Sequence, residues 1–143
     1  MFFKKKSSNN SKSKYKNKKV EYNGIVFDST KEKNRYIFLK AQENLGAIHD
    51  LQLQVKYELI PAIKEEYVEH LKTKDRVKTR TVQLAITYTC DFQYYKNGVI
   101  VTEDVKASPK TASLDKTFLI KEKLFRWKFN RPIKRVYNAT EEI

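Results

Sequence analysis

The dipeptide Asn97-Gly98 separates two long runs of β-forming residues, and it constrains the fold more than any other feature of the sequence. Asn-Gly between two such runs is typical of a two-residue β-hairpin turn. The sequence therefore predicts an antiparallel pair of strands, over residues 81–95 and 99–106. In such a turn Lys96 faces Val99, and this one pair fixes the register of the whole ladder.

In this register Asp91 lies directly opposite Asp104, and Lys106 lies one residue pair further along the same face of the sheet. Paired side chains have Cβ atoms about 4.5–5.5 Å apart, and like charges so placed destabilise a sheet unless something compensates them. A divalent cation is the obvious compensation, since Mg²⁺ commonly binds one or two carboxylates together with water and substrate phosphate. We therefore expect Asp91 and Asp104 to be metal ligands for Mg²⁺, for which Mn²⁺ can substitute. Lys106 would orient or deprotonate the attacking water and counter developing charge.

The opposite face of the same hairpin is apolar. It collects Ile86, Tyr88, Cys90, Phe92, Tyr94, Val99, Val101 and Val105. We expect these side chains to join the core, with Cys90 as a small core residue. Glu103 falls on this face, and we expect it at a strand end or sheet edge rather than in a catalytic position. For the polar face, the alternative to a catalytic site is a solvated salt-bridge cluster on an exposed sheet surface.

A helix start precedes the hairpin in the sequence. Ser29-Thr30-Lys31-Glu32 forms a capping box, with serine at the N-cap and glutamate three residues later. The apolar spacing that follows predicts a helix ending at Gly46, the usual residue after a helix C-cap. Glu32 therefore has two interpretations, a helix cap or a carboxylate of the metal site.

The remaining elements complete an α/β pattern. The sequence predicts a hairpin over residues 20–27, a strand over 49–60, a helix over 113–129 and a strand over 133–137. Residues 61–80 are interpreted as a long loop or a hairpin extension that includes one helical turn over 65–71. After the first hairpin the order is α-β-β-β-α-β, which indicates a single domain with a mixed central sheet flanked by helices. Residues 1–19 are expected to form a disordered basic tail.

The charge balance indicates a polyanionic partner. The chain has 30 Lys and Arg against 17 Asp and Glu, a net charge of +13. DNA is the leading candidate, ahead of an anionic membrane surface. No apolar run approaches the roughly 20 residues of a membrane span, and the start lacks the apolar core of a signal peptide. With one cysteine and two isolated histidines, His49 and His70, neither an internal disulfide nor a Cys- or His-based metal motif is expected. These features predict a soluble intracellular protein.

Three segments together resemble the PD-(D/E)XK nuclease superfamily, and more narrowly its small phage-encoded members. They are residues 27–32, 88–92 and 103–106, and the similarity extends over about residues 14 to 138. The resemblance implies a restriction-endonuclease-like domain over residues 20–143. It also implies that Asp91, Asp104 and Glu32 bind the metal and that Lys106 is the catalytic lysine. The chain departs from the pattern at Cys90, where a proline can precede the aspartate, and at Ala107, where these phage proteins often carry glycine.

These inferences lead to the hypothesis of a magnesium-dependent DNA endonuclease. The resemblance suggests phage or mobile-element DNA processing or recombination in the host cytoplasm, for example resolution of branched DNA, and a homodimer. The rival hypothesis is a non-catalytic DNA-binding module whose basic surface works with stacking aromatics such as Tyr94 and Tyr95. The paired carboxylates argue against this rival, because they stand where phosphates would have to approach. A third possibility is an inhibitor or adaptor that binds host proteins.

Overall fold

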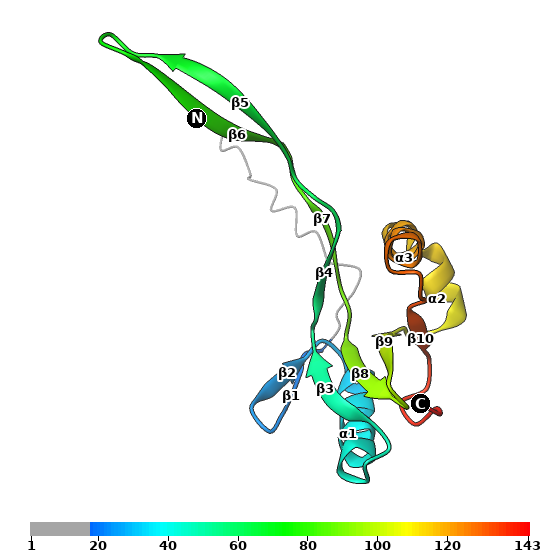
Figure 1. Cartoon of the computed structure of the whole chain (residues 1–143). Coiled ribbons are helices and arrows are strands. Elements are labelled where there is room, and N and C mark those ends of the chain that lie inside the picture. Colours follow the sequence, from blue (N-terminus) through cyan, green and yellow to red (C-terminus); the bar gives the residue numbers. More distant parts are fainter. Residues whose placement is uncertain (1–17) are drawn as a thin grey trace, which may run out of the picture.

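A computed structural model describes residues 18–143 of the chain (Figure 1). Almost all of the tail expected at residues 1–19 lies outside the described residues. The helices in the described part are α1 (Thr30–Asn44), α2 (Pro109–Leu114) and α3 (Lys116–Phe129). Its strands are β1 (Val20–Tyr22), β2 (Ile25–Phe27), β3 (His49–Leu53), β4 (Lys56–Ile60), β5 (Ile63–His70), β6 (Asp75–Gln83), β7 (Ile86–Thr89), β8 (Phe92–Lys96), β9 (Val99–Val105) and β10 (Lys134–Val136).

The central sheet has the strand order β10-β9-β8-β3. Strand β10 runs parallel to β9, whereas β8 pairs antiparallel with both β9 and β3. The predicted α/β class and the mixed sheet are therefore confirmed. The Asn97-Gly98 turn is also confirmed, with positive φ at both residues (51° and 76°). The predicted register holds from Lys96↔Val99 to Phe92↔Glu103.

Helix α1 begins and ends where the sequence predicted. The Ser29 side chain caps it by accepting a hydrogen bond from the Glu32 backbone N–H. Gly46 follows the C-cap with φ of 76°, a conformation that costs glycine little. The second predicted helix, over residues 113–129, is wrong in its start and continuity. Ser108 caps α2 ahead of Pro109, and the Asp115 side chain then caps a separate helix, α3.

Two predicted strands are interrupted. The strand over residues 49–60 breaks at Gln54, which has φ of 53°, and the strand over 81–95 divides among β6, β7 and β8. The inner halves, β3 and β8, stay in the central sheet, and the outer halves, β4 and β7, form a two-stranded sheet of their own. Cys90 N–H still donates to the Val55 carbonyl (3.0 Å) across the break.

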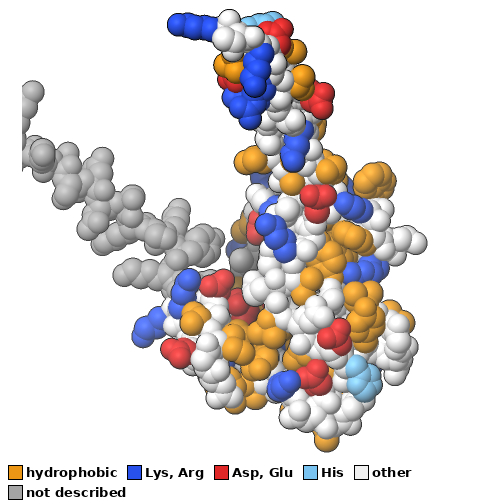
Figure 2. Space-filling view, turned by 60° about the vertical axis from the view of Figure 1, so that its left-hand side comes forward, with side chains coloured by type: hydrophobic (Ala, Val, Ile, Leu, Met, Phe, Trp, Pro, Cys, Tyr) orange, Lys and Arg blue, Asp and Glu red, His pale blue; other side chains and the backbone are white. Residues whose placement is uncertain are grey.

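Residues 61–80 belong to a long hairpin, so the hairpin alternative is confirmed and the helical turn at 65–71 is wrong. Strands β5 and β6 pair from Ile63↔Gln83 to His70↔Asp75. Figure 1 shows this hairpin extending away from the body of the molecule, beyond the β4–β7 sheet. We call β5, β6 and the turn between them the arm, and we call the rest of residues 18–143 the body. In Figure 2 the arm is a narrow projection that bears many Lys and Arg side chains.

The core is divided into two apolar clusters. One packs against α1 and contains Phe27, Leu39, Ile48, Phe92 and Tyr94. The other packs against α3 and contains Leu59, Tyr88, Cys90, Phe118, Phe125 and Ile133. The single apolar face predicted for the hairpin is therefore shared between two clusters, and the division falls at Asp91. None of the helices in residues 18–143 is long and apolar enough to cross a bilayer.

Glu103 corrects a further prediction. It lies inside the central sheet, fully buried, and not at a strand end or edge. Buried charge is costly unless it is paired and hydrogen-bonded, and here Arg35 of α1 supplies both. The guanidinium donates to both Glu103 carboxylate oxygens at 2.8 and 2.6 Å, and the Tyr94 hydroxyl donates to one of them at 2.6 Å. This ion pair fixes α1 against β9.

Candidate active site

Asp91 stands at the point where the chain leaves the central sheet, between β7 and β8. Its backbone N–H donates to the Glu103 carbonyl (3.1 Å), and its carboxylate accepts a hydrogen bond from the Val105 N–H (2.7 Å). The regular ladder ends at the neighbouring pair, Phe92↔Glu103. Asp91 is therefore held against β9 partly by its side chain rather than as the ordinary cross-strand pair expected with Asp104.

Asp104 lies on β9 and is almost completely buried, its side chain 9% exposed. Lys106 Nζ lies 2.8 Å from its Oδ1, and the Tyr88 hydroxyl donates to its Oδ2 (2.9 Å). Lys106 also sits over the Phe118 ring of α3, with 3.7 Å between Nζ and the ring centroid. The group is not the solvated, exposed cluster that the sequence left open as an alternative.

Like charges meet at Asp91. Burial raises the pKa of Asp91 to about 7, and the carboxylates of Asp104 and Glu32 push it in the same direction. The Val105 N–H and the Lys106 ammonium oppose this rise. A protonated carboxyl or a bound cation would relieve the repulsion. The three carboxylates and the lysine predicted from the sequence thus lie within electrostatic reach of one another.

Glu32 takes part in the cap of α1. Its Oε1 accepts a hydrogen bond from the Ser29 hydroxyl (3.1 Å), and its Oε2 accepts one from the Asp28 N–H (3.2 Å). In a regular capping box the glutamate accepts a hydrogen bond from the N-cap N–H, here that of Ser29, so this cap uses the neighbouring backbone group instead. Burial raises the pKa of Glu32, and the charge of Asp104 adds to this effect. Glu32 is therefore a cap residue whose carboxylate also feels the buried aspartate.

The family of the chain follows from a profile match. The profile, described as "Protein of unknown function (DUF1064)", covers residues 12–139. The chain belongs to the DUF1064 family. No curated protein and no solved structure shows significant similarity to this chain.

The carboxylates of Glu32, Asp91 and Asp104 in this DUF1064 chain form hydrogen bonds with other groups of the same chain. Within residues 18–143, no three His, Cys, Asp or Glu side chains are arranged as a group that could hold a metal ion. Mg²⁺ does not require three, because one or two carboxylates with water suffice. Asp91 and Asp104 offer hard oxygen donors and a local excess of negative charge, so their chemistry fits Mg²⁺. Cys90 offers no thiolate, because burial raises the pKa of its thiol to about 12.

Two contacts of the DUF1064 site were missed by the sequence interpretation. Tyr88 was assigned to the core alone, yet its hydroxyl holds Asp104, and burial raises the pKa of this phenol so that it remains a donor. Lys31 Nζ donates to the carbonyls of Lys106 (3.2 Å) and Ala107 (2.8 Å), which ties α1 to the end of β9. Tyrosine two residues before the break at Cys90-Asp91 was the available signal for the first contact; the second joins distant segments and had none.

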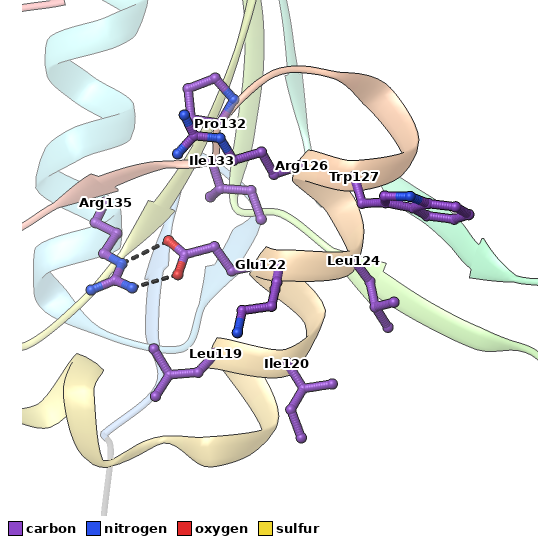
Figure 3. A pocket seen from close by; sticks show the side chains of 10 residues that line it. Leu119, Ile120, Glu122, Leu124, Arg126, Trp127, Pro132, Ile133 and Arg135 are labelled. Atoms are coloured by element: carbon purple, nitrogen blue, oxygen red, sulfur yellow. Dashed lines mark hydrogen bonds and ion pairs between the residues drawn. The ribbon is translucent and has the colours of Figure 1, made fainter.

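A groove elsewhere on this DUF1064 chain is separate from the acidic group. It lies along α3 and is lined by Ile120, Leu124, Trp127 and Ile133 among others, beside an ion pair between Glu122 and Arg135 (Figure 3). Arg135 Nε donates to the Glu122 carboxylate at 2.7 Å. None of Glu32, Asp91, Asp104 and Lys106 lines this groove. The groove is therefore no part of the candidate active site.

Proposed function

We propose that this chain is a metal-dependent DNA endonuclease with a restriction-endonuclease-like arrangement of its sheet and helices. The observation that carries the proposal is the convergence of Asp91, Asp104 and Lys106 at one end of β9, where burial and repulsion raise the pKa of Asp91. A group of buried like charges costs stability, so its presence calls for a ligand that compensates it. The net charge of +13 makes DNA the favoured substrate.

Each residue has a defined part in this proposal. Asp91 and Asp104 would hold Mg²⁺, which when bound supplies charge stabilisation and activates water for phosphodiester hydrolysis. Lys106 provides a positive charge beside the reacting phosphate and a proton-transfer group, and its contact with Phe118 fixes its position. Tyr88 orients Asp104, and Lys31 holds the backbone that carries Lys106. Glu32 adds negative charge from α1.

The biological setting proposed is phage or mobile-element DNA processing, with branched DNA as a candidate substrate and a homodimer as the assembly that cuts two strands. The test incubates the full-length protein with linear, nicked, single-stranded and four-way-junction DNA. Each substrate is combined with Mg²⁺, Mn²⁺ or EDTA. We expect cleavage of at least one substrate with either metal and none with EDTA.

Two variants serve as controls for contaminating nucleases. Asp104→Asn removes a carboxylate, and Lys106→Met keeps an alkyl chain over Phe118 while removing the charge. Both should lose cleavage, including at saturating Mg²⁺. Binding without cleavage of any substrate would favour the non-catalytic DNA-binding module instead, and equal cleavage by parent and variants would refute the assigned site.

A further inference from the structure

The arm carries a regular series of basic residues. Every second residue from 72 to 80 is basic: Lys72, Lys74, Arg76, Lys78 and Arg80. Arg76, Lys78 and Arg80 belong to β6 and share one face of it, because side chains alternate along a strand. Lys72 and Lys74 continue the series into the turn at the tip. We call these five residues the basic stripe.

Acidic neighbours neutralise only part of the basic stripe. Glu69 pairs with Lys78 at 2.6 Å, and Glu65 pairs with Arg80 at 3.4 Å, both across the ladder from β5. Among residues 18–143, none of Lys72, Lys74 and Arg76 takes part in a salt bridge. The unpaired positive charges therefore gather at the distal end of the arm, farthest from the body (Figure 1).

The arm does not contribute to the core of the body. Neither apolar cluster contains a residue of β5 or β6. Apolar side chains of the arm remain exposed, including Val68 (48%) and Val77 (65%), which face each other on the ladder. A two-stranded hairpin without a third strand or a packed helix is at best marginally stable alone. These features indicate that the arm contacts a partner outside the body.

We propose that the arm binds duplex DNA, with the basic stripe against its phosphate backbone. A two-stranded ribbon fits the major groove, which is about 12 Å wide. At about 3.4 Å per residue the part of the stripe from Lys74 to Arg80, beyond the turn, spans roughly 20 Å, which is more than half of one helical turn of about 34 Å. A second copy of the chain is a poorer occupant, because two basic stripes would repel each other.

The proposal deepens the proposed function, on which the choice of DNA rests, by placing duplex contacts far from the cut. The chain runs from Asp91 through β7 and β6 to the tip, and 15 extended residues cover about 50 Å. At about 3.4 Å per base pair this distance corresponds to roughly 15 base pairs. The arm would therefore require duplex DNA on one side of the cleaved bond, whatever the structure at the bond itself.

The test measures DNA binding of the full chain in EDTA, so that it does not depend on cleavage. The affinity for a duplex of about 30 base pairs is measured by fluorescence anisotropy over a range of salt concentrations. This duplex is about twice as long as the roughly 15 base pairs between the tip of the arm and the cleaved bond. The arm variant carries Lys72→Gln, Lys74→Gln and Arg76→Gln. The matched control carries Lys56→Gln, Lys116→Gln and Lys123→Gln, which remove the same charge from exposed positions outside the arm. A charge-preserving variant carries Lys72→Arg, Lys74→Arg and Arg76→Lys.

Each phosphate contact contributes about 0.9 to the slope of log affinity against log salt. We expect the arm variant to lose about 2–3 from this slope, and the control and charge-preserving variants to keep the parent's slope. Several results would overturn the proposal. One is a parent that fails to bind duplex DNA, and another is an arm variant that keeps the salt slope of the parent. A third is a control that loses as much of the salt slope as the arm variant, and a fourth is an arm that binds duplex RNA as tightly as duplex DNA. A change of oligomeric state in the arm variant, seen by light scattering, would assign the arm to a second copy instead.

The outcomes separate the arm from the nuclease. Arm-dependent binding by a protein that cuts no DNA would leave this inference standing and refute the proposed function. Metal-dependent cutting with an unchanged salt slope in the arm variant would do the reverse.

Discussion

The body and the arm hold their charges in different ways. In the body, Arg35 and Glu103 are both fully buried and joined by two hydrogen bonds, and the Tyr94 hydroxyl donates a further hydrogen bond to Glu103. On the arm, Lys78 and Glu69 are separated by 2.6 Å as well, but about a third of each side chain is exposed. Each polar atom of a buried charged group needs a hydrogen-bond partner, so a buried ion pair fixes the relative positions of the elements that carry it. Exposed charges are screened and adaptable, so they are suited to long-range attraction of a polyanion.

The largest expected effect separates chemistry from DNA binding. Asp104→Asn should reduce cleavage to below detection, because it removes a carboxylate that we propose binds the metal. The same variant should bind duplex DNA in EDTA with the parent's salt slope, because the basic stripe is intact. The single substitution Lys74→Gln in the arm should show the opposite: weaker DNA binding, and the parent's cleavage rate at saturating DNA concentration. Loss of binding in Asp104→Asn would show that the two regions are not independent.

Two matched substitutions compare the ion pairs directly. Arg35→Met should lower the free energy of unfolding by about 3–5 kcal/mol, because it leaves the buried Glu103 carboxylate with only Lys134 Nζ, at 3.7 Å, as a charged partner. Lys78→Met should change it by no more than about 1 kcal/mol, as is usual for an exposed pair. Urea denaturation of both variants and the parent gives the two values. Equal effects would contradict the division into a rigid body and an independent arm.

The third prediction uses the pKa of Asp91, which burial and neighbouring carboxylates raise to about 7. A raised carboxyl pKa favours the folded state below the unfolded value of about 4. That contribution is lost as the pH rises through about 7. In EDTA at pH 8, Asp91→Asn should therefore be more stable than the parent by about 1–3 kcal/mol, since one pKa unit corresponds to about 1.4 kcal/mol. The difference should shrink toward pH 4.5.

Magnesium provides the control for this prediction. At pH 8 the ion should raise the melting temperature of the parent, because a ligand that binds only the folded state stabilises it. The same ion should have little effect on Asp91→Asn. A parent whose melting temperature does not respond to Mg²⁺ would count against Asp91 as a metal ligand, independently of any cleavage assay.

Local signals predicted much of the fold. Asn97-Gly98 set the register of β8 and β9, and Ser29 with Gly46 set the ends of α1, because each depends on residues close in sequence. The same register predicted that Asp91 lies near Asp104 and Lys106, although the regular ladder ends at Phe92↔Glu103 and the Asp91 side chain itself binds β9 through the Val105 N–H. The site therefore followed from a turn and an alternation of side chains.

The rest depended on distant partners. The apolar alternation of Tyr88, Cys90, Phe92 and Tyr94 continues through the break at Asp91, so the pattern cannot reveal that two different helices cover it. Glu103 was expected at an edge because its partner, Arg35, lies 68 positions away. The arm gave no apolar periodicity, because both of its faces are exposed and neither needs to be apolar.

The two parts of the capping box should give a smaller and separable effect. Ser29→Ala should cost about 0.5–2 kcal/mol of stability as a lost cap, with most of the cleavage retained. Glu32→Gln should change stability little, since glutamine also serves at this position of a capping box, and should reduce cleavage if the carboxylate contributes to the site. Thermal melting and initial cleavage rates measured on the same samples distinguish the two. A Glu32→Gln variant that cleaves at the parent's rate would limit Glu32 to the cap.

The smallest expected effect on stability comes from the largest change in the chain. Strands β4 and β7 pair through Ile60↔Ile86, so residues 62–84 can be replaced by an Asn-Gly turn between Pro61 and Ala85. The free energy of unfolding should change by less than about 1 kcal/mol, because the deleted segment contributes to neither apolar cluster, and large effects require loss of core packing or buried partners. The shortened chain should also lose the part of the salt slope that belongs to the basic stripe, while cleaving at saturating DNA concentration at the parent's rate. A body that unfolds without its arm would show that the arm is structural, and the contrast between the two regions would then fail.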